Sequence, residues 1–233
     1  MYILSLETST KIFSLAVSKD DKILRFRNIR TDRILESSII PAIDKLLVSC
    51  HLSLKDIDTL AIGLGPGSFT SLRVGLSTVK AFALATNKKL IGVSSLDILA
   101  SGVVSQRSDE ICVLVDARRG KVYAAIFDKS LNCKSGYLLT TLDDVLGKVH
   151  GETLFVGDGL VLYKEHIEKS YQEATDQKQK GSRPMFSKER FWYPKAIELA
   201  RLLSRNLINL KYEDPAKIVP IYLYPQDCQV NRK

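Results

Sequence analysis

Apolar and polar positions alternate over the first 30 residues, in three short runs separated by polar breaks. The runs cover residues 2–7, 12–18 and 22–29, and the breaks fall at 8–11 and 19–21. Alternation with a period of two residues is typical of half-buried strands, and short polar breaks between such runs are typical of turns. The pattern therefore predicts an antiparallel meander of three strands.

Longer apolar stretches follow the meander. In residues 34–50 the apolar side chains recur every three or four positions, which is the spacing of one helix face. Residues 72–85 are apolar over the length of a helix. The elements expected in this part are a helix over 34–50 that Pro41 kinks or delays, a strand over 57–62, a helix over 72–85, a strand over 90–93 and a helix through Ala100.

A polar segment at residues 106–110 separates this half from a second one that begins in the same way. Residues 171–188 are polar and are expected to form a mobile loop. Pro194 suits the first turn of a final helix, whose apolar stripe is Ile197, Ala200, Leu203 and Leu207. The other elements expected here are strands over 111–115 and 122–127, a helix over 141–149 and a strand over 154–156.

The order of these elements indicates an α/β fold. Three antiparallel strands followed by a helix, a strand and a helix suit the ribonuclease-H-like half of a two-lobed fold of the actin, sugar-kinase and Hsp70 type. The second half begins with the same order of elements as the first half but has fewer of them. The sequence therefore predicts two lobes, of which the second is shortened.

Residues 63–75 contain the densest group of turn residues in the chain, between the predicted strand 57–62 and the predicted helix 72–85. Three glycines and a proline within five residues require a tight turn, because glycine reaches positive φ at no steric cost. We call this segment the glycine corner; its key residues are Gly65, Pro66, Gly67, Ser68 and Arg73. It lacks the lysine of a phosphate-binding P-loop and the third glycine of a dinucleotide fingerprint. A ligand-free corner and an anion-binding loop both remain open.

The stretch G-P-G-S-F-T-x-L-R-V-G at residues 65–75 closely resembles the signature of the TsaB (YeaZ) family. Shorter matches follow in the family's order over nearly the whole chain. They are the opening L-S-L-E-T-S-T at 4–10, V-S-S-L-x-x-L-A at 93–100, D-A-R-x-G-x-V-Y at 116–123, V-G-D-G at 156–159 and P-I-Y-L at 220–223. The chain departs from the family's common residues at Glu7 (usually Asp), Ser71 (commonly Gly) and Tyr224 (often Arg).

The resemblance implies a noncatalytic dimerisation subunit of the bacterial complex that forms N6-threonylcarbamoyladenosine at position 37 of tRNA. The implied partners are a TsaD-like catalytic subunit, a TsaE-like ATPase and, through the complex, tRNA; a homodimer of the lone chain stays open. No cofactor is implied as required, and ATP with Mg remains a candidate. The implied first lobe covers residues 1–105 and a helix at about 194–210, and residues 106–193 and 211–233 form the second lobe and the tail.

The helix at 72–85 is nonpolar on nearly every side, so we expect its own core or another subunit to cover it all round. In the family, this helix and the one before it pair with the corresponding helices of the TsaD subunit. The interface residues that this implies are Ile39, Ile43, Leu46, Leu72, Gly75, Leu76, Val79 and Phe82.

Two other functions compete with this interpretation. A small ATP-dependent phosphotransferase of the sugar-kinase superfamily would use the two hairpin turns, with Glu7, Thr8, Ser9, Asp116 and Arg118 as candidate nucleotide-binding residues. Direct RNA binding would use Arg118, Arg119 and the loop at 178–183, and the net charge of +8 is favourable for a polyanion.

The sequence contains no recognisable motif for catalysis or metal binding. The histidines, His51, His150 and His166, are far apart, and the four cysteines form no C-x-x-C pair. In the catalytic TsaD paralogue a paired-histidine motif follows the strand after the corner helix, and Ser95 and Leu99 stand at those positions here. We therefore expect no catalytic and no metal site. With an apolar strand at its beginning and scattered cysteines, the chain is expected to lack a signal peptide and a membrane span, and to reside in the cytoplasm.

Overall fold

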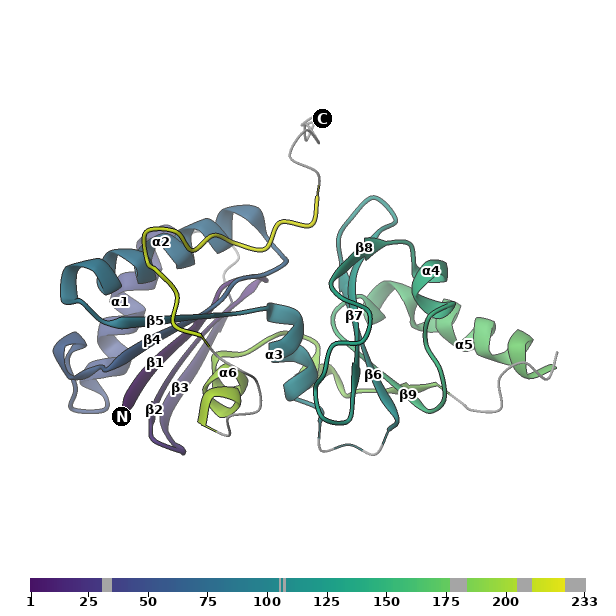
Figure 1. The fold of residues 1–233 in the computed structure, drawn as a ribbon, viewed down its shortest axis with the longest axis horizontal. Helices are drawn as coiled ribbons and strands as arrows, with labels where there is room; N and C mark the ends of the chain where they lie inside the picture. The colour runs from purple at the N-terminus through teal and green to yellow at the C-terminus, as the bar shows by residue number, and fades with distance from the viewer. Residues whose placement is uncertain (31–34, 105, 107, 177–183, 205–210, 225–233) are drawn as a thin grey trace.

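The computed structural model describes residues 1–30, 35–104, 106, 108–176, 184–204 and 211–224 of the 233. Two five-stranded sheets lie side by side, each with its own helices, and form two lobes (Figure 1). The α/β class and the two-lobed arrangement predicted from the sequence are confirmed.

The first sheet contains the predicted meander, β1 (Tyr2–Glu7), β2 (Ile12–Lys19) and β3 (Lys22–Arg30), followed by β4 (Thr59–Gly63) and β5 (Lys89–Val93). Its order is β3-β2-β1-β4-β5. The meander strands pair antiparallel, whereas β1, β4 and β5 pair parallel. Strand β4 begins two residues later than predicted because the Ile57 N–H instead closes a 3-10 turn (Leu54–Asp56) on the Leu54 carbonyl.

Helices cover both faces of the first sheet. Helices α1 (Leu35–Val48) and α2 (Phe69–Thr86) pack on one face, and α6 (Ala196–Ser204) packs against β1 and β2 on the other. Pro41 lies inside α1, so the helix does not begin late. Helix α6 begins at Ala196, so Pro194 precedes the helix instead of lying in its first turn, and Leu207 lies outside the described residues.

The second sheet has the order β10-β9-β6-β7-β8. Its strands are β6 (Glu110–Asp116), β7 (Val122–Asp128), β8 (Leu138–Thr140), β9 (Thr153–Val156) and β10 (Met185–Phe186), and its helices are α4 (Leu142–Leu146) and α5 (Leu160–Asp176). Helix α4 is shorter than predicted. The predicted loop at 171–188 is wrong at both ends, since α5 extends to Asp176 and β10 pairs with β9. Residues 177–183 lie outside the described residues.

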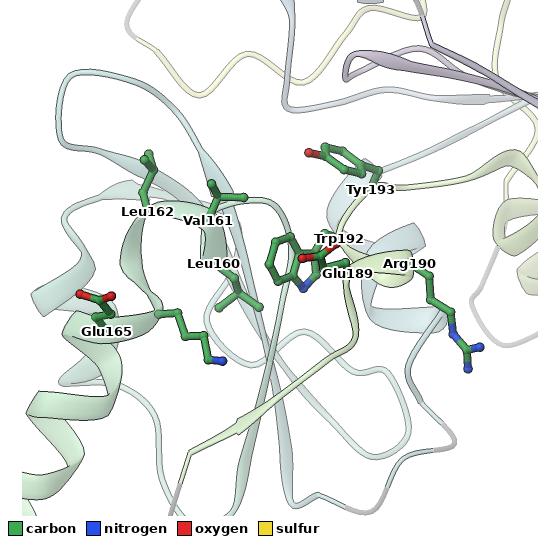
Figure 2. A pocket seen from close by; sticks show the side chains of 9 residues that line it. Leu160, Val161, Leu162, Glu165, Glu189, Arg190, Trp192 and Tyr193 are labelled. Atoms are coloured by element: carbon green, nitrogen blue, oxygen red, sulfur yellow. The ribbon is translucent and has the colours of Figure 1, made fainter.

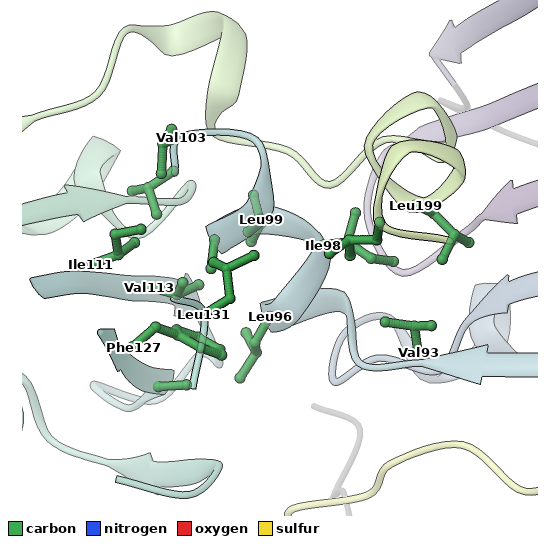
Figure 3. Packing of buried hydrophobic residues seen from close by; sticks show 14 of the residues in the cluster. Val93, Leu96, Ile98, Leu99, Val103, Ile111, Val113, Phe127, Leu131 and Leu199 are labelled. Carbon is green, nitrogen blue, oxygen red and sulfur yellow. The ribbon is translucent and has the colours of Figure 1, made fainter. Parts of the chain in front are cut away.

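Helix α3 (Ser95–Ser101) lies between the two sheets and joins their cores (Figure 3). Leu96 is fully buried and belongs to the same apolar cluster as Phe127 of β7. Ile98 is also fully buried and belongs with Leu199 of α6 to that cluster. The two lobes therefore share one continuous core at their base.

Residues 211–224, which we call the strap, run along the first lobe before they reach the second (Figure 1). Glu213 pairs with Leu90 at the β5 edge, and the Ile221 N–H donates to the Leu64 carbonyl (2.8 Å). The hydroxyl of Tyr224 donates to the Ala117 carbonyl in the second lobe (2.9 Å). The sequence grouped this segment with the second lobe, whereas most of it lies on the first.

Candidate functional site

Backbone groups of the glycine corner bond to the chain's own residues. The Gly65 N–H donates to Ser95 Oγ (3.1 Å), and the Ser95 N–H donates to the Gly65 carbonyl (2.8 Å). The Ser68 N–H donates to the Ser9 carbonyl (2.7 Å). Gly65 has φ +87°, which explains a glycine at this position. These bonds hold the β1–β2 turn, β4 and α3 together, as in a structural corner.

Three glycines around the corner make room for the turn that contains Glu7, Thr8 and Ser9. A Cβ on Gly63 would lie 1.9 Å from Glu7 Oε2, and one on Gly67 would lie 2.3 Å from the Ser9 carbonyl oxygen. A Cβ on Gly75 of α2 would lie 2.3 Å from Thr8 Oγ1. Such distances are far inside van der Waals contact, so only glycine lets the polar turn pack this closely.

Glu7 is a fully buried carboxyl at the centre of this packing. The Ser9 N–H donates to its Oε1 (2.6 Å), and the Ser95 hydroxyl donates to its Oε2 (2.9 Å). Burial raises the pKa of Glu7, and the hydrogen bonds from Ser9 and Ser95 oppose this rise. Thr8 and Ser9 are 1% and 2% exposed, so in this structure none of the three candidate residues presents its side chain to a nucleotide.

Glu7→Gln is expected to make the chain more stable at neutral pH. The pKa of Glu7 is higher in the folded chain than in the unfolded chain. Glu7 therefore adds to the free energy of unfolding at a pH below its unfolded-state pKa, and this contribution is lost as the pH rises through its folded-state pKa. Glutamine keeps the shape and two hydrogen-bonding atoms without the charge. Urea unfolding at pH 4 and pH 7 measures this difference, and the exposed Glu165→Gln is the control. A variant stabilised equally at both pH values would contradict the raised pKa of Glu7.

Asp116 and Arg118 lie apart from that turn, in the β6–β7 hairpin of the second lobe. Asp116 Oδ1 accepts from the Arg118 N–H (2.8 Å), and Oδ2 lies 3.4 Å from Arg118 Nη1. The Asp116 N–H donates to Asp158 Oδ1 (3.2 Å), and burial raises the pKa of Asp158. Asp116 thus fixes its own hairpin.

Two hollows in the surface of the described residues are lined by residues other than these candidates. Figure 2 shows one of about 900 Å³ between the start of α5 and the segment before α6. A second, of about 480 Å³, lies between β3, α3 and α6. The first is lined by Leu160, Val161, Leu162, Lys164, Glu165, Glu189, Arg190, Trp192 and Tyr193.

Most of the implied interface residues face the core of the chain itself. Val79 and Leu46 are fully buried, and of the others only Phe82 is more than slightly exposed. A side chain that the monomer already covers offers no surface to a partner, so these residues do not themselves form a docking surface. The buried members are Ile39, Ile43, Leu46, Leu72, Gly75, Leu76 and Val79.

Other side chains of α1 and α2 face outward, so the chain's own core covers only part of α2, and the covering of its outer side by another subunit stays a prediction. Ile40, Val48 and Leu84 are 55%, 62% and 62% exposed, and Ala81 and Ala85 are also exposed. We call these five residues the outward face. This face was not predicted because all apolar positions of each helix were taken as equivalent. Ala81 follows Ser77 by four residues, and Leu84 and Ala85 follow Ala81 by three and four, which is a helix-face spacing that was a usable signal.

The family resemblance places Ser95 and Leu99 where the catalytic paralogue has histidines, and both side chains are buried. Ser95 is 1% exposed and bonded to Glu7, and Leu99 is 2% exposed in the shared core. Within the described residues, no three His, Cys, Asp or Glu side chains gather as a metal site. Burial raises the pKa of the Cys112 thiol.

No helix in the described ranges has both the length and the apolar character needed to cross a bilayer.

The remaining residues of the glycine corner, and the residues that differ from the family's common ones, lie near the start of α2 and on the strap. Ser68 and Ser71 are exposed or half-buried, and their hydroxyl oxygens are 3.0 Å apart, so the Ser71 side chain is hydrogen-bonded within the corner. The Arg73 guanidinium stacks on Phe69 and its Nε donates to the Tyr222 hydroxyl (3.1 Å). Tyr224 fastens the strap to the second lobe.

Comparison with known proteins relates the whole arrangement to one family. The family model described as TsaD, tRNA N6-adenosine threonylcarbamoyltransferase, matches residues 30–186. A TsaB protein of Escherichia coli is 33% identical over 133 residues, which are 57% of each chain; the chain thus spans little more than half of that relative. A TsaB protein of Bacillus subtilis is 27% identical over 179 residues, 72% of this chain and 76% of the relative.

Solved structures show the same fold. YeaZ from Pseudomonas aeruginosa superposes with a TM-score of 0.75 at 22% identity, over 95% of this chain and 99% of that one. The family model covers well over half of the chain, and the signature at the glycine corner agrees with it. The chain therefore belongs to the TsaD family, as a member of its TsaB (YeaZ) group.

Proposed function

We propose that this chain is a noncatalytic subunit that holds a TsaD-like protein in the conformation that transfers threonylcarbamoyl to N6 of adenosine 37 in tRNA. The Escherichia coli relative is named a tRNA threonylcarbamoyladenosine biosynthesis protein. The observation that carries the proposal is the burial of Ser95 and Leu99. Neither the hydroxyl of Ser95, which is bonded to Glu7, nor a leucine side chain can replace a metal-binding histidine there.

The outward face of α1 and α2 is the surface that we assign to the TsaD-like subunit. It presents large apolar side chains, Ile40, Val48 and Leu84, beside the small Ala81 and Ala85, which permit close approach of another helix. The same face would join two copies when the partner is absent. A TsaE-like ATPase would complete the complex. A cytoplasmic location of the complex suits its substrate, tRNA.

Leu84→Glu or Ile40→Glu is expected to abolish copurification with the TsaD-like subunit, with affinity reduced by about 100-fold, because each places a charge in an apolar contact. Both side chains are more than half exposed, so the variants should fold. Leu162→Glu is the matched control, since Leu162 is 60% exposed on α5 in the other lobe and should retain binding. Copurification and sizing chromatography are the measurements.

Undiminished binding by both folded variants would reject this face as the docking surface. The phosphotransferase alternative has its own readout. Mg-ATP turnover by the lone chain, lost in Asp116→Ala, would replace the scaffold proposal with an enzymatic one.

A further inference from the structure

We propose that this subunit contacts RNA directly, through a basic and aromatic surface where the strap reaches the second lobe. The residues of this surface are Phe69, Arg73, Arg118, Arg119, Lys121 and Tyr222. Its ligand is a single-stranded RNA loop, whose bases would stack on the rings while its phosphates meet the cations. The inference rests on the proposed function, to which it adds a share in holding the tRNA.

Two aromatic rings and a guanidinium group are already arranged for stacking. The Arg73 guanidinium carbon lies 3.8 Å from the centre of the Phe69 ring, and its Nε donates to the Tyr222 hydroxyl (3.1 Å). The Phe69 and Tyr222 rings lie 5.4 Å apart and are tilted by 39°. Phe69 is 53% and Tyr222 is 42% exposed, so the group is ordered by its own contacts yet open to solvent. A base that stacks there would meet side chains held in position.

The neighbouring β6–β7 hairpin presents arginines in a backbone conformation that does not favour them. Arg118, Arg119 and Gly120 have φ of +65°, +55° and +71°. A side chain in this region costs about 1 kcal/mol, and Asn or Gly would suit the turn better. Asp116 steadies the turn through the Arg118 N–H, and the Arg118 side chain is 87% exposed. Strain of this kind tends to be kept where the side chain has a use.

The strap brings the stacked group and the hairpin next to each other. Tyr224 donates to the carbonyl of Ala117, the residue before Arg118, and its ring lies edge-on to Tyr123 at 6.1 Å. Only one residue, Leu223, separates Tyr224 from Tyr222, so their Cα atoms are at most about 7 Å apart. The strap thereby links the hairpin to Tyr222, whose ring lies beside Phe69 at the start of α2.

The charges favour a phosphate-bearing ligand over a protein. Arg119 and Lys121 are exposed, whereas the carboxylate of Asp116 is half-buried and paired with Arg118. Phosphate contacts of this kind release counterions and depend strongly on salt. The outward face of α1 and α2 is apolar and suits a protein, whereas this surface combines stacking groups with cations.

The test measures the affinity of the lone full chain for a fluorescent tRNA anticodon stem-loop, by anisotropy. We expect binding that weakens as salt increases, and at least about tenfold weaker binding by Arg119→Glu/Lys121→Glu. Lys148→Glu/Lys169→Glu changes the net charge equally at exposed sites of the second lobe and should change affinity less than about threefold. Phe69→Ala should weaken loop binding by about fivefold or more while leaving binding to a blunt RNA duplex unchanged.

Absence of salt-dependent binding by the lone chain would overturn the proposal, and so would equal losses in the two double charge variants. Arg119→Ala, which keeps Lys121, replaces the double variant if that variant fails to fold. Copurification of Arg119→Glu/Lys121→Glu with the TsaD-like subunit should be normal. A failure of RNA binding is thereby distinguished from a failure to bind the TsaD-like subunit, which the variants of the outward face measure.

Discussion

Gly67→Ala should lower the free energy of unfolding by about 2–3 kcal/mol, although it adds a single methyl group. The new Cβ would lie 2.3 Å from the Ser9 carbonyl oxygen and 2.8 Å from Ser9 Cβ. That oxygen accepts the Ser68 N–H, so the turn cannot move away without losing the bond that fixes the start of α2. Urea unfolding followed by circular dichroism measures the loss.

Gly136→Ala separates this contact effect from backbone strain. Gly136 has φ +69° with nothing within 4 Å of an added Cβ, so its cost of about 1 kcal/mol comes from conformation alone. If Gly67→Ala destabilised the chain no more than Gly136→Ala, the close approach of the two turns would not limit the choice of residue at position 67.

Leu96→Ala should cost about 2–5 kcal/mol and should lower the stability of both lobes together. Leu96 is fully buried on α3, in the cluster that includes strands of both sheets. A cavity at this place removes contacts on both sides, so thermal unfolding is expected to remain a single transition with a lower midpoint. Calorimetry provides the midpoint and the comparison of calorimetric with van't Hoff enthalpy.

Leu162→Ala is the matched truncation, because Leu162 is 60% exposed and should change stability by no more than about 0.5 kcal/mol. Two separate transitions in Leu96→Ala, with one lobe unaffected, would show that the lobes fold independently and that α3 belongs to only one of them.

The first lobe could be predicted well because its signals are local. Alternation over residues 2–30 fixed the meander, and the density of glycine located the corner to within a few residues. Helix α5 was missed because its polar side chains dominate the composition. Its apolar stripe is buried at Leu160, Ile167 and Tyr171 and partly buried at Tyr163, has helical spacing and packs on the second sheet.

The site could be predicted less well because it depends on contacts between distant residues. The bond between Glu7 and Ser95 joins positions 88 residues apart, and no periodicity indicates it. The turn at residues 7–9 was a candidate nucleotide site, whereas the glycines at 63, 67 and 75 pack directly against Glu7, Ser9 and Thr8. Apolar spacing identified α1 and α2 but did not show which apolar side chains face the sheet and which face solvent.

The position of α6 has a consequence for synthesis on the ribosome. The Ala196 N–H donates to Ser14 Oγ across 182 residues of sequence, and α6 packs on the two strands that emerge first. One side of the first sheet must therefore stay uncovered while the whole second lobe is translated. During that interval the nascent chain presents an apolar strand surface, and we expect it to depend on chaperones until residues 196–204 leave the exit tunnel.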